Sequence, residues 1–183
     1  MQVHMNQIRL QRFVLPLLLV LGSCGLNEFD VTQSGSATVP GGGALAGLLG
    51  AFPAVSGFNN FDFSQSQDFK NQNAQKSHVS SAKLKSFTLK ITSPNDEGFA
   101  FLDSIAFFAE ANGQRVRVAH KENIASLGLN APNPTLTLEL DNQELASFVK
   151  ADSMTLSTEA SGRQPTEDTT IVATAVFHVG VSP

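Results

Sequence analysis

The sequence predicts an all-β fold: an antiparallel β-sandwich of about eight strands with one short connecting helix, immunoglobulin-like in general form. Short runs of alternating apolar and polar residues recur from residue 58 onward in the 183-residue chain, as in sheets with one solvated face. Gly, Pro, Asn and Asp separate these runs, and helical periodicity is well marked only after Leu140. Such a succession of elements is typical of a sandwich. The chain has one Cys and no Trp, so the immunoglobulin likeness is architectural only.

The expected strands follow from period-two alternation. A possible first strand, EFDVTQSGSATV (28–39), has Phe29, Val31 and Gln33 on one face. LDSIAFFAEA (102–111) is apolar on both faces and is therefore expected in the middle of a sheet. The other runs are FDFSQSQDF (61–69), SFTLKIT (86–92), RVRVAH (115–120), TLTLELD (135–141), SMTLSTE (153–159) and TTIVATAVFHVGV (169–181).

Two local signals refine this pattern. Asn112-Gly113 lies between two runs and predicts a tight hairpin. After Leu140, Asp141 and Glu144 have the spacing of a capping box, and the apolar residues that follow share one helical face. We therefore expect a short helix that begins at Asp141 and buries Leu145, Phe148 and Val149.

A glycine-rich apolar segment, residues 41–58, interrupts the alternation. No charged residue occurs between Asp30 and Asp62, and the glycines disfavour both helix and strand. Leu45, Leu48, Leu49 and Phe52 nevertheless have helix-like spacing. Two interpretations remain open: the segment packs onto the domain, or it contacts the membrane or a partner.

The amino terminus has the layout of a secretory signal. Arg9 and Arg12 lie in a region without acidic residues, an apolar run covers residues 13–22, and small residues precede Cys24. That run is too short to cross a bilayer, which takes about 20 apolar residues. We expect an export signal over residues 1–23 that is removed.

The stretch Leu21-Gly22-Ser23-Cys24 resembles the lipobox of bacterial lipoproteins. The resemblance implies cleavage between Ser23 and Cys24, a diacylglyceryl group on the Cys24 thiol, and further acylation by a fatty acid such as palmitate. Cys24 is the one cysteine of the chain, whereas exported domains use structural cysteines in pairs. Gly25 follows, where an aspartate would retain such a lipoprotein in the inner membrane. The resemblance thus implies an outer-membrane location in a two-membrane bacterium.

These observations divide the chain into three parts. Residues 1–23 are the signal peptide, residues 24–57 are a lipidated amino-terminal segment with the possible first strand and the glycine-rich stretch, and residues 58–183 are the β-sandwich domain. Removal of the signal reduces the 12 basic residues by Arg9 and Arg12 and leaves all 16 acidic ones, so the net charge becomes −6. An acidic chain without a basic cluster argues against nucleic acid as a partner.

Catalytic and metal-binding motifs are absent from the sequence. Neither HExxH, GxSxG, a P-loop nor CxxC occurs, and the sequence predicts no enzyme activity, cofactor or metal. Of the histidines left after cleavage, His178 is expected on the solvent face of the last strand. The remaining polar candidates are His78, His120, the amide-rich segment 68–79, the acids Asp96, Glu97, Asp141, Asp152, Glu167 and Asp168 as pooled calcium ligands, and Arg163, which either contacts an anion or pairs locally with Glu167 or Asp168.

The sequence therefore favours a lipid-anchored, non-enzymatic structural or interaction module of the cell envelope. Its expected partners are the membrane, through the acyl chains on Cys24, and an envelope protein that the sequence does not identify. The alternative is a ligand-binding domain for carbohydrate or for calcium-dependent adhesion. The chain has fourteen Phe but neither Trp nor Tyr, which disfavours carbohydrate because sugar-binding platforms use aromatic rings with a polar edge.

Overall fold

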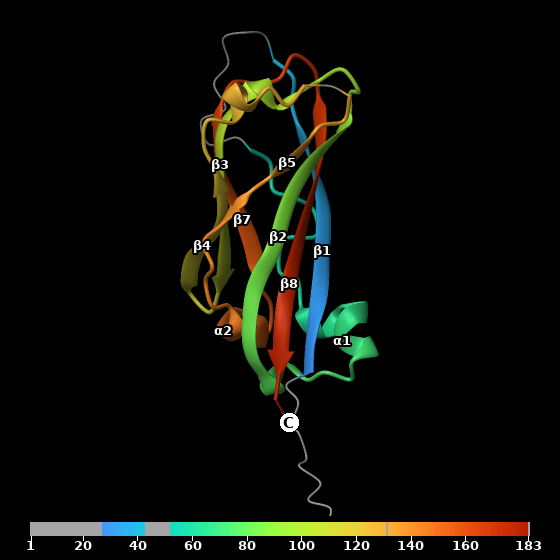
Figure 1. The fold of residues 1–183 in the computed structure, drawn as a ribbon, viewed down its shortest axis with the longest axis vertical. Coiled ribbons are helices and arrows are strands. Elements are labelled where there is room, and N and C mark those ends of the chain that lie inside the picture. Colours follow the sequence, from blue (N-terminus) through green and yellow to red (C-terminus); the bar gives the residue numbers. More distant parts are fainter. Residues whose placement is uncertain (1–26, 43–51, 131, 183) are drawn as a thin grey trace, which may run out of the picture.

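The computed structural model describes residues 27–42, 52–130 and 132–182. They form two antiparallel four-stranded sheets that pack face to face, which confirms the predicted all-β sandwich (Figure 1). The strand orders are β1-β8-β2-β5 and β6-β4-β3-β7. The strands are β1 (Asn27–Val39), β2 (Val79–Ser93), β3 (Leu102–Ala111), β4 (Gln114–Lys121), β5 (Thr135–Thr137), β6 (Glu139–Leu140), β7 (Thr155–Gly162) and β8 (Thr169–Val181).

Strand β8 organises the first sheet. It pairs with β1 without interruption over thirteen residues, from Asn27 opposite Val181 to Val39 opposite Thr169. On its other side it pairs with β2, whose fifteen residues contain three register shifts. Such irregularities increase the local twist of a strand. The three strands run the length of the sandwich (Figure 1).

The second sheet is arranged around β3, which lies between β4 and β7 as its two-sided apolar pattern predicts. Asn112 and Gly113 form the β3–β4 turn with φ values of 51° and 74°. Positive φ at both positions is the requirement of a type I′ hairpin turn, which Asn-Gly satisfies best. The predicted hairpin is therefore confirmed.

The run 61–69 is not the strand that its alternation predicts. It contains the 3-10 helix η1 (Phe63–Gln65) and the helix α1 (Gln67–Asn71). The carboxylate of Asp62 accepts from the amide of Ser64, and the hydroxyl of Ser66 accepts from the amide of Phe69. These two side chains cap helical turns, a role for which Asp and Ser are well suited. Their hydrogen bonds to nearby backbone amides favour helical turns over the strand that the alternation predicts.

The run 135–141 is not one strand either. Its first part, β5, pairs with β2 in one sheet, and its second part, β6, pairs with β4 in the other. Leu138 lies at the crossing, where its amide still donates to the carbonyl of Phe87 at 3.0 Å. This segment therefore joins the two sheets, and an alternating pattern alone does not reveal a change of partner.

The helix after Leu140 starts later than predicted. Leu145, Phe148 and Val149 are all buried, as expected. Leu145, however, is the N-cap residue of helix α2 (Ala146–Lys150) and precedes its first turn. Asp141 does not cap the helix, because its carboxylate binds Arg117. Glu144 accepts from the amides of Ala82 and Ala146 and so fixes the helix against β2. The other short helices are η2 (Lys76–His78), η3 (Phe99–Phe101) and η4 (Ile124–Leu127).

The sandwich also includes residues that the sequence division placed before residue 58. All of β1 belongs to the first sheet, so the domain begins at Asn27 at the latest. Leu45, Leu48 and Leu49 lie outside the described residues, as does the rest of 43–51. Residues 52–58 pack onto the domain: Val55 and Phe58 are buried, and the amide of Ser56 donates to the carbonyl of Ser36 in β1.

Phenylalanine fills the space between the sheets. Phe87 of β2 and Phe107 of β3 face each other with ring centroids 4.3 Å apart, and Phe58 contacts both edge to face. All three side chains are fully buried. Between the sheets a Tyr hydroxyl or a Trp N–H would need a hydrogen-bonding partner, whereas a Phe ring needs none. This agrees with a composition that includes Phe but neither Tyr nor Trp.

We expect Phe107→Ala to lower the free energy of unfolding of the mature protein by about 3–5 kcal/mol, because it removes a buried ring and leaves a cavity between the sheets. The neighbouring Phe108 points to the outer face, where Arg115 lies 3.5 Å from its ring centroid. The matched control Phe108→Ala should cost less, on the order of 1 kcal/mol. Equal losses in chemical denaturation would contradict the assignment of faces on β3.

Candidate functional site

The residues on which the sequence-based function depends precede the described part of the chain. Ser23 and Cys24, the implied cleavage and lipidation residues, lie outside the described residues. The first described residue, Asn27, is three positions after Cys24 and is already paired with Val181. The amino terminus of the sheet therefore lies beside the end of β8, at the lower end of the molecule in Figure 1.

This end of the sandwich carries a small polar hollow of about 170 Å³. Ser182 donates its amide to the carbonyl of His78 at 2.9 Å, which fastens the end of the chain to η2. The amide-rich segment of the sequence analysis lies here, and His78 is exposed in it. The hollow is lined by Asn27, Gln72, Asn73, Ala74, Gln75, His78, Val181 and Ser182.

Lys76 ties this polar segment to the body of the domain. Its ammonium group lies 2.8 Å from the carboxylate of Asp62 and also donates to the carbonyls of Ala151 and Asp152. Desolvation raises the pKa of Asp62, but hydrogen bonds from Lys76 and Ser64 outweigh it and keep that pKa below its usual value. The ion pair therefore persists at neutral pH and holds η2 in place.

His178 lies on the outer face of β8, as predicted, and it is hydrogen-bonded there to β1. Its Nδ1 is 2.8 Å from a carboxylate oxygen of Asp30, and its Nε2 is 3.3 Å from Glu28. The hydrogen bond to Asp30, followed by that to Glu28, raises the pKa of His178 above its usual value. Lys85, and then His178, lower the pKa of Asp30. The cluster thus joins three neighbouring strands by charge.

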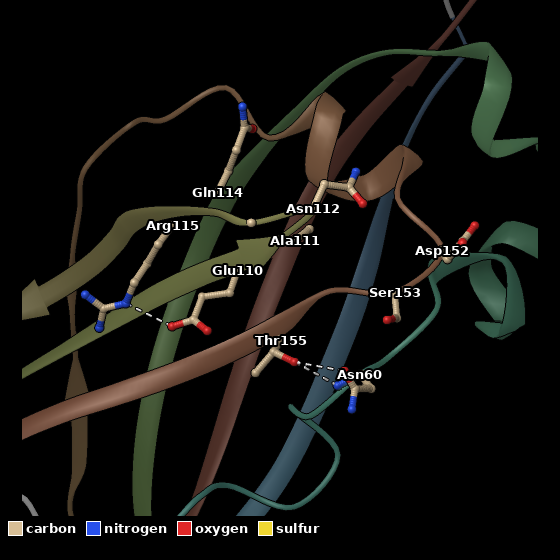
Figure 2. A pocket seen from close by; sticks show the side chains of 10 residues that line it. Asn60, Glu110, Ala111, Asn112, Gln114, Arg115, Asp152, Ser153 and Thr155 are labelled. Atoms are coloured by element: carbon tan, nitrogen blue, oxygen red, sulfur yellow. Dashed lines mark hydrogen bonds and ion pairs between the residues drawn. The ribbon is translucent and has the colours of Figure 1, made fainter.

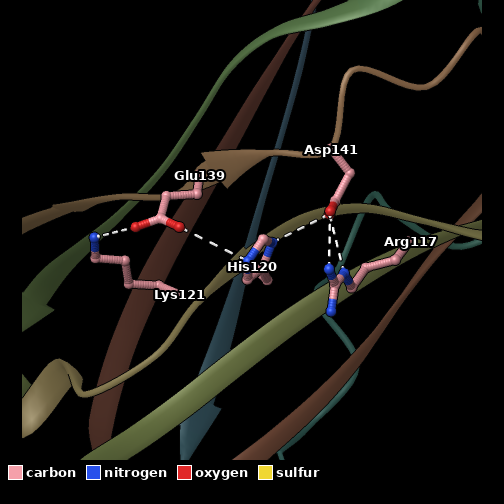
Figure 3. A network of polar contacts seen from close by, with 5 residues as sticks. All are labelled: Arg117, His120, Lys121, Glu139 and Asp141. Carbon is pink, nitrogen blue, oxygen red and sulfur yellow. Dashed lines mark hydrogen bonds and ion pairs between the residues drawn. The ribbon is translucent and has the colours of Figure 1, made fainter.

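His120 lies within a second network, on the outer face of β4 and β6 (Figure 3). Arg117 donates two hydrogen bonds to Asp141, at 3.0 and 2.9 Å, and the same carboxylate lies 3.2 Å from Nδ1 of His120. The Nε2 of His120 faces Glu139 at 3.7 Å, and Glu139 accepts from Lys121 at 2.7 Å. The hydrogen bond from Arg117 is the main cause that lowers the pKa of Asp141, and that from Lys121 lowers the pKa of Glu139.

The charged groups of this network connect β4 to β6 and to Asp141, the residue that follows β6. A general base needs one ring nitrogen free to face a reacting group, whereas both nitrogens of His120 face carboxylates. The network connects β4 with the segment that leaves β6. Sequence reasoning identified His120 and Asp141 separately but did not pair them, because they are 21 residues apart with no motif to link them.

A hollow of about 390 Å³ lies beside the β3–β4 turn (Figure 2). Two of its charged groups, Glu110 and Arg115, are paired with each other, since Glu110 accepts from Arg115 and from Ser157, and Arg115 also reaches Glu159 at 2.6 Å. The hydrogen bond from Ser157, aided by Arg115, lowers the pKa of Glu110. Ligand sites in proteins are mainly apolar and enclosed. This hollow, lined by turn residues, has neither property.

The acidic loops considered for calcium do meet at the opposite end of the sandwich. Glu97 accepts from the hydroxyl of Thr166 at 2.7 Å, and Asp168 accepts from the amide of Gly41 at 2.8 Å. These carboxylates bind loop groups rather than converge. Among the described residues, no group of three or more His, Cys, Asp or Glu side chains is placed to hold a metal ion.

The other polar candidates also have local structural contacts. Arg163 donates to the carbonyl of Ala100 at 2.9 Å and is not paired with Glu167 or Asp168, so the predicted local ion pair is wrong. Asp152 is exposed at the rim of the hollow beside the hairpin. Within the part of the chain that is described, no helix is long and apolar enough to span a bilayer.

Comparisons with known proteins assign no family to the chain. No family model matches the sequence, and no curated protein matches it. A solved crystal structure of the decameric BFDV capsid protein aligns with 87% of this chain and 100% of that chain, at 9% sequence identity and a TM-score of 0.39. A similarity this weak supports no conclusion about function. The described residues form a β-sandwich domain.

We expect Asp30→Asn to lower the pKa of His178 toward its ordinary value near 6.5, because the largest cause of the increase is removed. NMR titration of the imidazole protons measures this directly. Asp141→Asn, on the other sheet, is the matched control and should leave the titration of His178 unchanged. A pKa of His178 that does not respond to the loss of Asp30 would refute the pairing.

The raised pKa also sets the pH dependence of stability. Since the folded pKa lies above the unfolded one, protonated His178 stabilises the fold fully below about pH 6.5, and this contribution is lost as the pH rises through the folded pKa. The stability difference between the wild type and His178→Gln should therefore shrink from pH 6 toward alkaline pH. Denaturation curves at several pH values test the sign.

Proposed function

We propose that this protein is a lipid-anchored, non-enzymatic module of the bacterial cell envelope, held in the outer membrane by acyl chains on Cys24. The observation that carries the proposal is the Leu21-Gly22-Ser23-Cys24 motif after an export signal. One acyl chain binds membranes only marginally, whereas two or three chains, at about 0.8 kcal/mol for each buried methylene, give lasting attachment. The role of the domain is to present its surface to an envelope protein.

The position of the motif relative to the fold supports this proposal. Only Gly25 and Leu26 lie between Cys24 and the first residue of β1. Cleavage before Cys24 would thus remove the signal without removing any residue of the sheet. A secretory signal is removed from the mature protein, so a signal that ends before the first described strand is compatible with cleavage at this point.

The polar clusters support the non-enzymatic part of the proposal. The imidazoles of His120 and His178 each face two carboxylates, and Glu110 and Asp141 are each held by an arginine. A catalytic side chain needs to face a substrate, and it needs a neighbouring group that activates it for the reaction. In these clusters the charges join strands to one another.

We expect Cys24→Ala to abolish lipidation. The wild-type protein extracted from membranes should begin at Cys24 and carry the added mass of its acyl chains, whereas the variant should keep residues 1–23 or lack the lipid. Intact-mass measurement with parallel membrane fractionation tests this. Since Cys24 is the single cysteine, a thiol-reactive maleimide should label neither protein.

Ser23→Ala is the matched control, because it keeps a small residue before the cleavage point and should be processed like the wild type. If Cys24→Ala is cleaved and soluble just as the wild type is, and the wild-type thiol reacts with maleimide, the anchor does not exist and the protein is simply secreted.

The outer-membrane location has a separate test at the residue after the cysteine. In bacterial lipoproteins an aspartate there favours retention in the inner membrane, so Gly25→Asp should move the acylated protein to the inner-membrane fraction of a density gradient. Gly25→Ser, a small uncharged control, should stay with the outer membrane. The same distribution for both variants would argue against outer-membrane sorting.

A further inference from the structure

The two ends of the sandwich differ in their chemistry. The end defined by Asn27, the segment 71–78 and residues 181–182 is here named the anchor end. The opposite end consists of the residues around η3 and η4 and the loop between β7 and β8 (Figure 1). Strand β1, with thirteen residues, separates the two ends by about 40 Å.

Chain geometry restricts how far the anchor end lies from the lipid. An extended chain spans at most about 3.6 Å per residue, so Asn27 lies within about 11 Å of Cys24. The polar headgroup layer on each side of the hydrocarbon core is several ångströms thick, since the bilayer measures about 30 Å without the headgroups and 40–45 Å with them. A lipid on Cys24 therefore brings Asn27 to the headgroups, and Val181 and His78 with it.

The side chains of the anchor end suit a polar contact with headgroups in which few charges are unpaired. Glu28, next to Asn27, faces His178 at 3.3 Å. No carboxylate occurs in the chain between Asp68 and Asp96. Amides donate and accept hydrogen bonds, so they match both the phosphates and the amines of phospholipids. Lys70 and Lys83 are exposed nearby, and Lys76 is neutralised by Asp62. The exposed amide side chains are Asn71, Gln72, Asn73 and Gln75.

The opposite end would be repelled by the same surface. Its loops carry more acidic than basic side chains, and anionic headgroups repel acidic groups near them. Among the described residues the one large apolar side chain that is well exposed, Leu127 at 44%, also lies there, in η4. The acids are Asp96, Glu97, Glu122, Glu167 and Asp168, against the bases Lys121 and Arg163.

We propose that the anchor end is seated on the phospholipid headgroups, so that the strands stand away from the bilayer and the acidic loop end lies farthest from it. This inference rests on the lipid anchor of the proposed function. The short tether holds the contact, and the amide-rich segment 71–78 makes it without inserting into the hydrocarbon.

The experiment uses the lipidated full-length mature protein in phosphatidylethanolamine and phosphatidylglycerol vesicles that contain a nickel-chelating lipid. Gln72→Cys, Lys90→Cys and Asp96→Cys each supply one nitroxide-labelling thiol at an exposed position. Gln72 is at the anchor end, Lys90 on the outer face of the first sheet, and Asp96 at the acidic end. Nickel at the headgroups should enhance relaxation of the nitroxide at residue 72 several-fold more than at residues 90 and 96.

Three results would overturn this orientation. Equal enhancement at residues 72 and 96 would mean that the domain tumbles freely, and the largest enhancement at residue 90 would mean that it lies on its sheet face. Insertion of fifteen Gly and Ser residues after Gly25 should abolish the difference, since such a linker reaches about 21 Å on average. If enhancement at residue 72 survives the insertion, the tether does not hold the contact. Labelling of the unsubstituted protein at Cys24 would instead show that the lipid anchor itself is missing.

Discussion

The uninterrupted pairing of β8 with β1 is the constraint on which the rest of the structure depends. β8 is the one strand of the first sheet bonded along nearly its whole length on both sides, by β1 and by β2. Its inward residues Ile171, Ala173, Ala175, Phe177 and Val179 form the floor on which the second sheet packs. A slip of one residue would turn this whole row outward. The same register places β1 and β8, the first and last described strands, side by side over their full length, so that the start of β1 lies next to the end of β8.

Most of the strands could be predicted from the sequence, because apolar and polar residues alternate wherever one face of a strand is solvated. The thirteen-residue run 169–181 matches β8 at both ends, and Asn112-Gly113 specifies its turn without tertiary information. The run 61–69 fails for a local reason, the capping by Asp62 and Ser66. The other two failures share one cause, since each depends on a partner distant in sequence. Asp141 has the side chain of a helix cap, but it binds Arg117 instead. Residues 135–141 change from one sheet to the other because they pair first with β2 and then with β4, which their own alternating pattern does not reveal.

The candidate functional residues likewise comprise a local motif, which the sequence reveals, and clusters between distant strands, which it does not. A lipobox is a local motif, recognised in the chain before folding, so four consecutive residues suffice to indicate it. The charged clusters around His120 and His178 arise only when strands far apart in sequence become neighbours, and composition gave no sign of them. The ion pairs around His178 are the more exposed of the two sets, and exposed pairs contribute little stability each. Opposite charges on neighbouring strands favour a pairing, whereas like charges opposite each other disfavour it.

The direction of β1 would have a mechanical consequence if the domain is attached through Cys24 as proposed. Hydrogen bonds in an antiparallel pair lie perpendicular to the strands, and β1 runs from the attached end to the far end of the sandwich. A pull between the two ends therefore acts along β1 and loads all of its bonds to β8 together, in shear, instead of peeling them apart one by one. The strand nearest the attachment point is thus fastened in the geometry that best resists extraction from the sheet.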